Sequence, residues 1–405
     1  MGSAKGGSPA PVSVVIVTYD PAPEMLGECL DSLARSKAAP QEILVADNSR
    51  RHDAVEQLLG RAIPSGLGPI FLPQSSNLGY AAATNAGVAA SSSELVLLLN
   101  PDAALEPEAL GELCEAASTR PETLGFAPKI RLSDPGVVID SVGMAIGRDG
   151  VGIQRGLGQA DLGQYDRPER VAGVCFAAAL VRRRAFSPGS VGALDERYFM
   201  YYEDVDWSMR AGIMGEEFRT VPRAAVRHLH SGSTRSLGQG FKHRLIQRNL
   251  IWTAVKNLEP EGALRVLARR SSANLKWAAA GRHPAAALRS VAEAWLGLSG
   301  VMLSRREVQR RRRRRDREVL GLEDAPVFFD TETYRPDVSA AALVAAVGRL
   351  FALSPTPALE RSLLRLRSAE ATGLGRDRAL LAAMLDGAGL AEGPALTWLR
   401  HELSS

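Results

Sequence analysis

Residues 95–102 read LVLLLNPD, five apolar residues in succession that end abruptly on Asn-Pro-Asp. A continuous apolar run is typical of a strand covered on both faces, because a strand with one wet face alternates apolar and polar residues. Three earlier runs have the same character, namely 12–17 (VSVVIV), 42–46 (EILVA) and 69–72 (PIFL). The stretch therefore predicts one of several buried, parallel strands.

Helical patterns separate these runs. Residues 24–36 (EMLGECLDSLARS) repeat apolar side chains at helical spacing, and residues 80–91 (YAAATNAGVAAS) predict a second, alanine-rich helix. Another helix is expected to begin at Pro107. Strands that alternate with helices predict an α/β sheet with right-handed crossovers.

Polar residues come directly after three of the four apolar runs, and the third run leads to a further cluster five residues on. They are Thr18-Tyr19-Asp20, Asp47-Asn48-Ser49, Asn77-Leu78-Gly79 and Asn100-Pro101-Asp102. A turn explains any one of these clusters taken alone. In open α/β sheets, however, ligands bind at the carboxyl edge of the strands, so four polar clusters at that edge favour a binding site.

The composition limits the class of protein. The 405 residues are 45% hydrophobic and 23% charged, which is typical of a globular chain of two or three domains. The cysteines lie far apart with no C-x-x-C pair, which predicts a reducing compartment and no disulfide framework: Cys29, Cys114 and Cys175. The N-terminal MGSAKGGSPAP lacks the apolar core of a signal peptide, and charged residues interrupt the best candidate membrane span, Ala285–Ser304. A cytoplasmic protein is expected.

Two nucleotide-binding motifs are missing from the sequence. No G-x-G-x-x-G follows the first predicted strand, and no G-x-x-x-x-G-K-[ST] occurs in the chain. We therefore expect neither a hydride-transferring Rossmann enzyme nor a P-loop enzyme.

Three groups of side chains suggest chemistry. The carboxylate of Asp102 suits Mg²⁺ or Mn²⁺ beside substrate phosphates, although a plain turn explains it equally well. The crowded carboxylates of 203–206 (EDVD) either complement a helix dipole or raise the pKa of one member, as a general base requires. His228 and His230 lie on one face of a predicted strand, where an imidazole is either structural or a further metal ligand. The aromatic residues at 198–202 form either a sugar-stacking wall or part of the core.

The chain resembles the family 2 glycosyltransferases. The resemblance covers roughly residues 11–250 and is greatest to the rhamnosyltransferase-like bacterial branch that builds cell-envelope glycans. It rests on six stretches in the order and spacing of the family: VSVVIVTYD (12–20), EILVADNS (42–49), NLGYAAATNAG (77–87), LLLNPDA (97–103), LDERYFMYYEDVDWSMR (194–210) and VRHLHSGS (226–233).

This resemblance implies a GT-A fold, an α/β sheet with flanking helices, followed here by a C-terminal helical extension. It implies inverting transfer of a sugar, rhamnose among the candidates, from a dTDP- or UDP-linked donor to a glycan or polyprenyl-linked acceptor. The implied cofactor is Mn²⁺ or Mg²⁺, which stabilises the leaving diphosphate.

The same resemblance implies site residues. Asp204 matches the family's catalytic base. Ten residues match its donor-binding positions: Thr18, Tyr19, Asp20, Asp47, Asn48, Asn77, Gly79, Asn85, Asn100 and Asp102. The implied metal ligands are Asp102, His228 and His230, and the implied acceptor contacts are Tyr202, Glu203 and Trp207.

Four positions depart from the family pattern and put its finer specificity in question. Asp20 stands where asparagine is usual, Leu194 replaces phenylalanine, and Trp207 replaces leucine or cysteine. Asn100 occupies the place of the second acid of the family's Asp-x-Asp, so a histidine ligand matters more in this chain.

A basic segment comes after the motifs of the family. Residues 262–318 contain 15 basic and 4 acidic residues, a net charge of +11, whereas the whole chain carries +4. Arginine and lysine alternate there with leucine and with Trp277 and Trp295, which predicts amphipathic helices on an anionic membrane surface. A solvated basic face packed on the catalytic domain is the alternative. The run 310–315 lacks stacking aromatics, so no nucleic acid is expected as a partner.

The expected organisation is a flexible tail at 1–10, a GT-A catalytic domain at 11–236, a basic helical segment at 237–319 and a helical module at 320–405. The last of these is predicted to serve docking or homo-oligomerisation. The leading hypothesis is a metal-dependent glycosyltransferase, cytoplasmic and peripheral at the inner face of the plasma membrane. The alternative is a membrane- or nucleic-acid-binding adaptor with a degenerate transferase domain.

Overall fold

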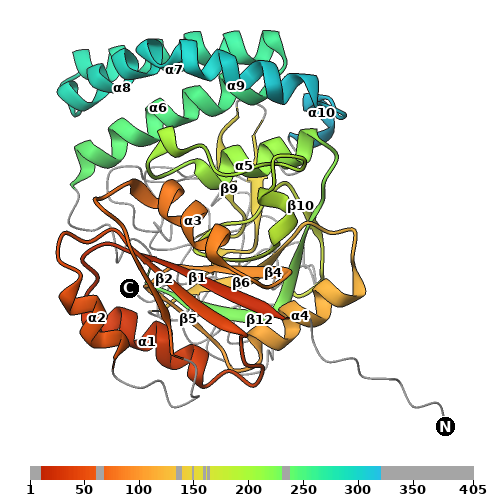
Figure 1. The fold of residues 1–405 in the computed structure, drawn as a ribbon. Coiled ribbons are helices and arrows are strands. Elements are labelled where there is room, and N and C mark those ends of the chain that lie inside the picture. The colour runs from red at the N-terminus through yellow and green to blue at the C-terminus, as the bar shows by residue number, and fades with distance from the viewer. Residues whose placement is uncertain are drawn as a thin grey trace, which may run out of the picture.

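The apolar runs form the centre of the fold. The structure, a computed structural model, describes residues 11–60, 68–133, 139–147, 150–157, 161, 165–229 and 238–320. Four of its strands are parallel neighbours in the order β4-β1-β2-β3 (Figure 1): β1 (Val12–Thr18), β2 (Glu42–Asp47), β3 (Ile70–Pro73) and β4 (Leu95–Leu99). Each lies within one residue of the predicted run, so the predicted buried parallel strands are confirmed.

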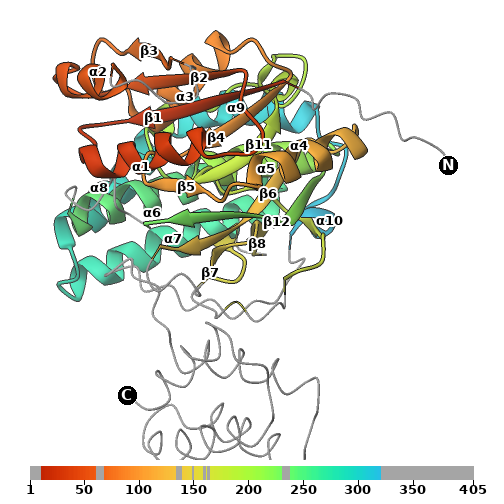
Figure 2. The ribbon, with the colours of Figure 1, turned by 90° about the horizontal axis from the view of Figure 1, so that it is seen from below.

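A second, mixed half extends this sheet to ten strands beyond β4. Seen from below, the strands succeed one another across the molecule from β3 to β12 (Figure 2). The order after β4 is β11-β6-β12-β10, while β5 pairs with β12 and β7 with β6. Their bounds are β5 (Ala103–Leu105), β6 (Gly125–Leu132), β7 (Ile139–Ser141), β10 (Arg170–Val171), β11 (Ala178–Arg182) and β12 (Phe218–His228). A separate hairpin pairs β8 (Met144–Ile146) with β9 (Gly152–Gln154).

Helices cover both faces of the sheet. On one face lie α1 (Pro23–Ala34), α2 (Asp53–Leu59) and α4 (Ala109–Thr119), and on the other α3 (Gly79–Ala90) and α5 (Glu203–Ile213). Short 3₁₀ turns occur at η1 (Arg183–Phe186) and η2 (Glu196–Tyr198). The predicted α/β sheet with flanking helices is confirmed. The short elements α2 and β5 were not predicted, since seven and three residues carry too little periodicity to be recognised.

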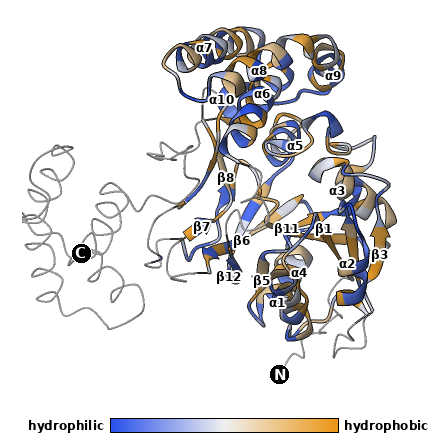
Figure 3. Cartoon of the chain, turned by 90° about the vertical axis from the view of Figure 1, so that its left-hand side faces the viewer, coloured by the Kyte–Doolittle hydropathy of each residue, from blue (hydrophilic) through white to orange (hydrophobic). Residues whose placement is uncertain are grey.

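A further helical layer lies over α5 (Figure 3). It consists of α6 (Gln239–Asn257), α7 (Pro260–Ala279), α8 (Pro284–Leu296), α9 (Leu298–Arg310) and α10 (Asp316–Val319). In the described residues, no helix is long and apolar enough to cross a membrane. The helical module predicted at 320–405 lies outside the described residues, apart from Leu320.

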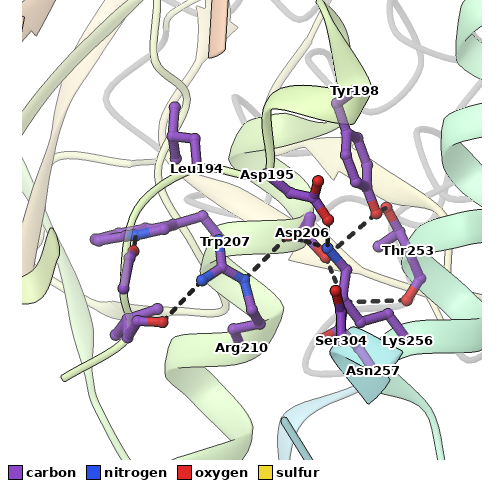
Figure 4. Close-up of polar contacts among 12 residues, drawn as sticks. Leu194, Asp195, Tyr198, Asp206, Trp207, Arg210, Thr253, Lys256, Asn257 and Ser304 are labelled. Atoms are coloured by element: carbon purple, nitrogen blue, oxygen red, sulfur yellow. Dashed lines mark hydrogen bonds and ion pairs between the residues drawn. The ribbon is translucent and has the colours of Figure 1, made fainter. Parts of the chain in front are cut away.

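A buried ionic network joins α5 to α6 (Figure 4). Asp206 is fully buried, and its Oδ2 accepts from Arg210 Nε at 3.0 Å and from Lys256 Nζ at 3.0 Å. Lys256 Nζ also donates to Asp195 Oδ2 at 2.6 Å, and Asn257 Nδ2 donates to Asp206 Oδ1 at 2.8 Å. Removing one partner of a buried ion pair leaves an uncompensated charge. Buried charge pairs therefore make α6 an integral part of the fold.

The arginine run after α9 is also used within the fold. Arg311 donates to the backbone carbonyl of Gly189, and Arg312 contacts Asp316 at 2.9 Å. Arg314 donates to the carbonyl of Glu216 at 3.3 Å. Arg311 and Arg314 thus bind backbone carbonyls of the segments before and after α5, while Arg312 pairs with the first residue of α10.

Candidate active site

The carboxylate of Asp47 hydrogen-bonds to residues at the carboxyl ends of β1 and β2. Thr18 lies opposite Asp47 in the strand register, and its hydroxyl donates to Asp47 Oδ1 at 2.8 Å. Ser49 donates to the same oxygen through its hydroxyl at 2.5 Å, and His52 Nδ1 lies 2.7 Å from Oδ2. The bond to Asp47 raises the pKa of His52. Because Asp47 is fully buried and His52 is 31% exposed, the imidazole is the part of this cluster that a ligand can reach.

Asn48 holds the next loop in place. Its Nδ2 donates to the Gly79 carbonyl at 3.1 Å, and its Oδ1 accepts from the Leu78 N–H at 3.2 Å. Gly79 has a φ of +84°, and a Cβ there would lie 2.4 Å from the Phe199 carbonyl oxygen. Only glycine fits such a position. The loop before α3 is thereby fixed between the end of β2 and the segment that precedes α5.

The predicted donor residues therefore divide into two groups. Thr18, Asp47 and Asn48 are buried and shape the edge of the sheet. Asp20 and Asn77 are exposed and Tyr19 is half-buried, so these are the side chains placed to meet a ligand.

Asn100-Pro101-Asp102 turns the chain from β4 into β5. The Ala103 N–H donates to the Asn100 carbonyl at 3.1 Å, which closes a turn with proline at its second position. Within the sheet, Ala103 pairs with His228 of β12. This register brings His228 Nε2 to 3.3 Å from Asp102 Oδ1.

Asp140, on β7, completes this corner. Its Oδ2 lies 2.6 Å from His228 Nδ1, and Asp102, Asp140 and His228 are all buried. Burial by itself lowers the pKa of His228, but the carboxylates of Asp102 and Asp140 outweigh it and raise the pKa to about 10. No motif pointed to Asp140, because a short strand pairing with β6 brings it here. Its carboxylate orients the imidazole as the outer partner of a metal-bound histidine does.

The corner fits a divalent cation as a two-residue site. Asp102 offers a carboxylate oxygen, and His228 offers an oriented imidazole nitrogen once a bound cation displaces the Nε2 proton that its raised pKa retains. Mg²⁺ and Mn²⁺ are commonly held by one or two protein ligands together with substrate phosphates and water. In the described part of the chain, no group of three or more His, Cys, Asp or Glu is arranged to hold a metal ion. Phosphate oxygens of a ligand and water would complete the coordination of an ion bound to Asp102 and His228. His230 lies outside the described residues.

A strained turn precedes α5. Phe199, Tyr201 and Tyr202 have φ values of 65°, 67° and 71°. The left-handed region costs about 1–2 kcal/mol for each non-glycine residue. Such strain persists only where the surroundings enforce it, and it gathers at functional sites. The turn ends directly at Glu203 and Asp204.

Helix α6 holds this turn in its strained form. The side chain of Asn249 is fully buried, and its Nδ2 lies 3.0, 2.9 and 2.7 Å from the carbonyl oxygens of Tyr198, Met200 and Tyr201. Arg248 Nη2 donates to the Tyr198 carbonyl at 3.0 Å. The sequence predicted a helix here but not this role, because an asparagine within a helix carries no recognisable motif.

Glu203 and Asp204 differ in their environment. Glu203 is buried, and burial together with the neighbouring Asp204 raises its pKa well above the usual range. Burial raises the pKa of Asp204 to about 6. Both carboxyls of the pair therefore hold their protons more tightly than free carboxyls do. A half-buried carboxylate with a raised pKa is suited to accept a proton.

A single short segment connects this carboxylate to the Asp102 corner. The Phe176 N–H hydrogen-bonds to Asp204, and the Ala177 carbonyl accepts from the Asn100 N–H at 2.9 Å. Burial raises the pKa of the thiol of Cys175, the residue before Phe176, and the charges of Asp204 and Asp140 raise it further. Asp204 and the Asp102–His228 corner therefore flank residues 175–177.

Two predicted contacts have other roles in the structure. Trp207 is fully buried against Phe186, at a centroid distance of 5.3 Å, and its Nε1 donates to the Gly192 carbonyl. The prediction of Trp207 as an acceptor contact is wrong, because α5 is enclosed on this side by the core. Asn85 Nδ2 donates to the Leu194 carbonyl at 2.9 Å, so its amide holds the loop before η2.

Part of the chain is similar to known proteins. Residues 13–188 match the family described as Glycosyl transferase family 2. The N-acetylglucosaminyl-diphospho-decaprenol L-rhamnosyltransferase of Mycobacterium tuberculosis is 34% identical over 248 residues, covering 55% of this chain and 76% of the relative. The O-antigen biosynthesis protein RfbC of Myxococcus xanthus is 27% identical over 251 residues, covering 57% of this chain and 19% of the relative.

Solved structures resemble the chain only distantly. The mannosyltransferase from Pyrobaculum calidifontis in complex with GDP-Man and Mn²⁺ is 16% identical, covering 75% of this chain and 86% of that one. Its TM-score is 0.44, which marks a distant likeness.

Proposed function

Because the chain belongs to the family 2 glycosyltransferases, in their rhamnosyltransferase-like branch, we propose that it transfers L-rhamnose from a dTDP- or UDP-linked donor to a hydroxyl of a polyprenyl-linked sugar. The chain is a transferase of class EC 2.4. The proposed sugar and acceptor follow the activity for which the M. tuberculosis relative is named, and the 34% identity supports them.

The observation that carries the proposal is the unequal pair Glu203 and Asp204. The ionised Asp204 removes the proton of the acceptor hydroxyl, and the freed oxygen attacks the anomeric carbon opposite the leaving diphosphate. A single displacement of this kind inverts the anomeric configuration. The raised pKa of the neighbouring Glu203 favours its neutral form, which reduces the negative charge next to the base.

Asp102 and His228 are the residues that would hold Mn²⁺ or Mg²⁺, with Asp140 fixing the imidazole. When bound, the ion would supply positive charge beside the departing diphosphate. The exposed Asp20 and Asn77 and the half-buried Tyr19 lie at the same edge, where the nucleotide would contact them.

Release of nucleoside diphosphate tests this function. The full chain would be incubated with dTDP-L-rhamnose, UDP-N-acetylglucosamine or GDP-mannose, a short polyprenyl-diphosphate N-acetylglucosamine and Mn²⁺. We expect turnover with the rhamnose donor and an inverted anomer in the product. Asp204→Asn should reduce kcat by about 10²–10⁴-fold, the usual contribution of a general base.

Glu122→Gln is the matched control, because Glu122 is an exposed carboxylate away from the site. Turnover of no donor, or full activity of Asp204→Asn, would contradict the proposal and favour the adaptor alternative. We also propose peripheral association with the membrane that holds the lipid-linked acceptor.

A further inference from the structure

The outer face of α7, α8 and α9 exposes an unusual amount of apolar surface. Ten large apolar side chains of the described residues are exposed, and seven of them lie on these three helices. They are Leu264, Leu275, Leu288, Trp295, Leu296, Met302 and Leu303, and we call them the outer apolar face. Leu296 is 82% exposed, Leu264 68% and Leu303 65%. Large exposed apolar patches usually mark a binding surface.

Packing within the protein does not explain the outer apolar face. The inward sides of the same helices already pack on α6 through small residues, among them Ala287, Ala294 and Val301. Trp252 of α6 donates from Nε1 to the Ala294 carbonyl at 3.0 Å, and Gly297 allows its ring to approach closely. Helices α7–α9 therefore have one set of apolar side chains buried in the fold and a second set exposed to solvent.

Positive charge surrounds the outer apolar face. From residue 264 to residue 306 the sequence has eight basic residues and one acidic residue, Glu293. Glu293 is directed inward and contacts Arg244 and Arg248 of α6. Six basic side chains are exposed among the leucines: Arg265, Arg269, Lys276, Arg282, Arg289 and Arg306.

A shallow hollow on α9 combines both properties. It is lined by Leu303, Arg306, Gln309 and Arg310, an apolar side chain next to two guanidinium groups. Guanidinium groups bind phosphate oxygens well, since their donors form a planar fork. Such a lining suits a phospholipid headgroup whose acyl chain lies against leucine.

We propose that the outer apolar face of α7–α9 binds the surface of an anionic lipid bilayer. Exposed leucines and a tryptophan enter the headgroup boundary while arginine and lysine contact anionic phosphates, the pattern of interfacial amphipathic helices. A face that buried another protein would be expected to balance both charge signs. Here the exposed basic residues outnumber the two exposed acidic ones, Glu261 and Glu307, which pair with Arg265 and Arg310. The proposal goes beyond the transferase activity and holds whatever sugar is moved.

The bound surface would lie next to the acceptor side of the site. Ser304 of α9 accepts a hydrogen bond from Arg197 Nη2 at 2.7 Å. Arg197 lies two residues before Phe199, the first strained residue of the turn that leads to Asp204. Tyr198 packs in one cluster with Trp252 and with Val301 of α9. A lipid-linked sugar in the same bilayer would therefore approach from the side on which Asp204 is held.

Co-sedimentation of the full chain with vesicles tests the proposal. We expect binding to phosphatidylcholine vesicles that contain phosphatidylglycerol and little binding to phosphatidylcholine alone. Each basic residue near an anionic surface contributes about fivefold in affinity, so Arg282→Gln with Arg289→Gln and Arg306→Gln should weaken binding about a hundredfold. Leu296→Ser with Leu303→Ser should also weaken it, and neither variant should lower the melting temperature, because these side chains are exposed.

Matched controls lie on other faces. Arg35→Gln with Lys37→Gln and Arg223→Gln removes the same charge from exposed positions, and Ile70→Ser removes an exposed apolar side chain. Both controls should bind like the parent protein. The fluorescence of the half-exposed Trp295 should shift to the blue on binding, and Trp295→Phe should abolish that shift.

Equal loss of binding in the control variants, or binding that ignores lipid charge, would overturn the proposal. Loss of self-association in Leu296→Ser with Leu303→Ser, without any vesicle binding by the parent chain, would assign the face to a second copy of the protein. The assay needs no sugar donor, so a failure here is distinguishable from a failure of the transferase proposal.

Discussion

Asn249→Ala should slow catalysis by releasing the turn that holds Asp204. The change removes the amide whose two N–H groups serve the carbonyls of Tyr198, Met200 and Tyr201. Arg248 still donates to Tyr198, so two carbonyls lose their donor. Each lost buried hydrogen bond costs about 1–2 kcal/mol, so the free energy of unfolding should fall by about 2–4 kcal/mol.

The effect on turnover arises from the strain in that turn. Three residues in the left-handed region store about 3–6 kcal/mol, which is comparable with what the Asn249 contacts supply. Without those contacts the turn relaxes and Asp204 moves. A displacement of about 1 Å at a reacting group costs on the order of 10² in rate, so kcat should fall about a hundredfold. The KM of the donor should change less than kcat, since the Gly79 loop packs against this turn but the predicted donor contacts at the ends of β1 and β2 do not belong to it.

Steady-state kinetics and thermal unfolding of the same samples would measure both effects. Asn274→Ala is the matched control, because Asn274 is also a buried helical amide, bonded to Gln247 and not to the turn. It should lose stability but keep its kcat. If Asn249→Ala keeps the parent kcat, or if Asn274→Ala loses as much, the reasoning is refuted.

Three further predictions concern charge. Because burial raises the pKa of Asp204 to about 6 and the base acts in its ionised form, kcat should rise with pH through about 6 and then level off; a pH–rate profile that is flat from about 5 to 8 would contradict the assignment. Asp140→Asn should weaken the apparent affinity for Mn²⁺ about 10–100-fold in calorimetric titrations of the protein saturated with dTDP or UDP, because His228 loses its orienting carboxylate, and unchanged affinity would exclude that role. Lys256→Met should lower the free energy of unfolding by about 3–5 kcal/mol, since Asp206 and Asp195 lose a shared cation; denaturant unfolding that matches the parent would show that Lys256 is dispensable.

The predictable part of the fold lies in its most apolar stretches. Runs such as 95–99 have one explanation, a strand buried on both faces, and the structure places it within a residue. The turn at Asn100-Pro101-Asp102 was also recognisable, because proline and asparagine punctuate a chain locally. The next strand, β5, was not recognisable, since it exists only through its pairing with β12, which is distant in sequence.

Site residues whose role depends on tertiary contacts could not be predicted either, because their partners are distant in the sequence. Asp140 approaches His228 across 88 positions, and Asn249 reaches the Tyr198 carbonyl across 51. Trp207 was predicted to contact the acceptor but is buried in the core. A motif position identifies the helix that carries a residue, but it does not say which side of that helix is buried. The helix dipole alone was a sufficient explanation for Asp206 in the sequence, yet Asp206 holds the buried network with Lys256.

The contact between α6 and the turn before α5 bears on where this enzyme can be cut or recombined. The family match ends at residue 188, and the sequence predicted a catalytic unit of 11–236. A protein truncated there would lack Asn249 and Lys256 and would retain the strained turn without its support. A chimera should therefore keep the chain intact as far as Leu320 and join the second protein after it. If α6 is replaced by the helix of a homologue, the turn at 199–202 should be replaced with it.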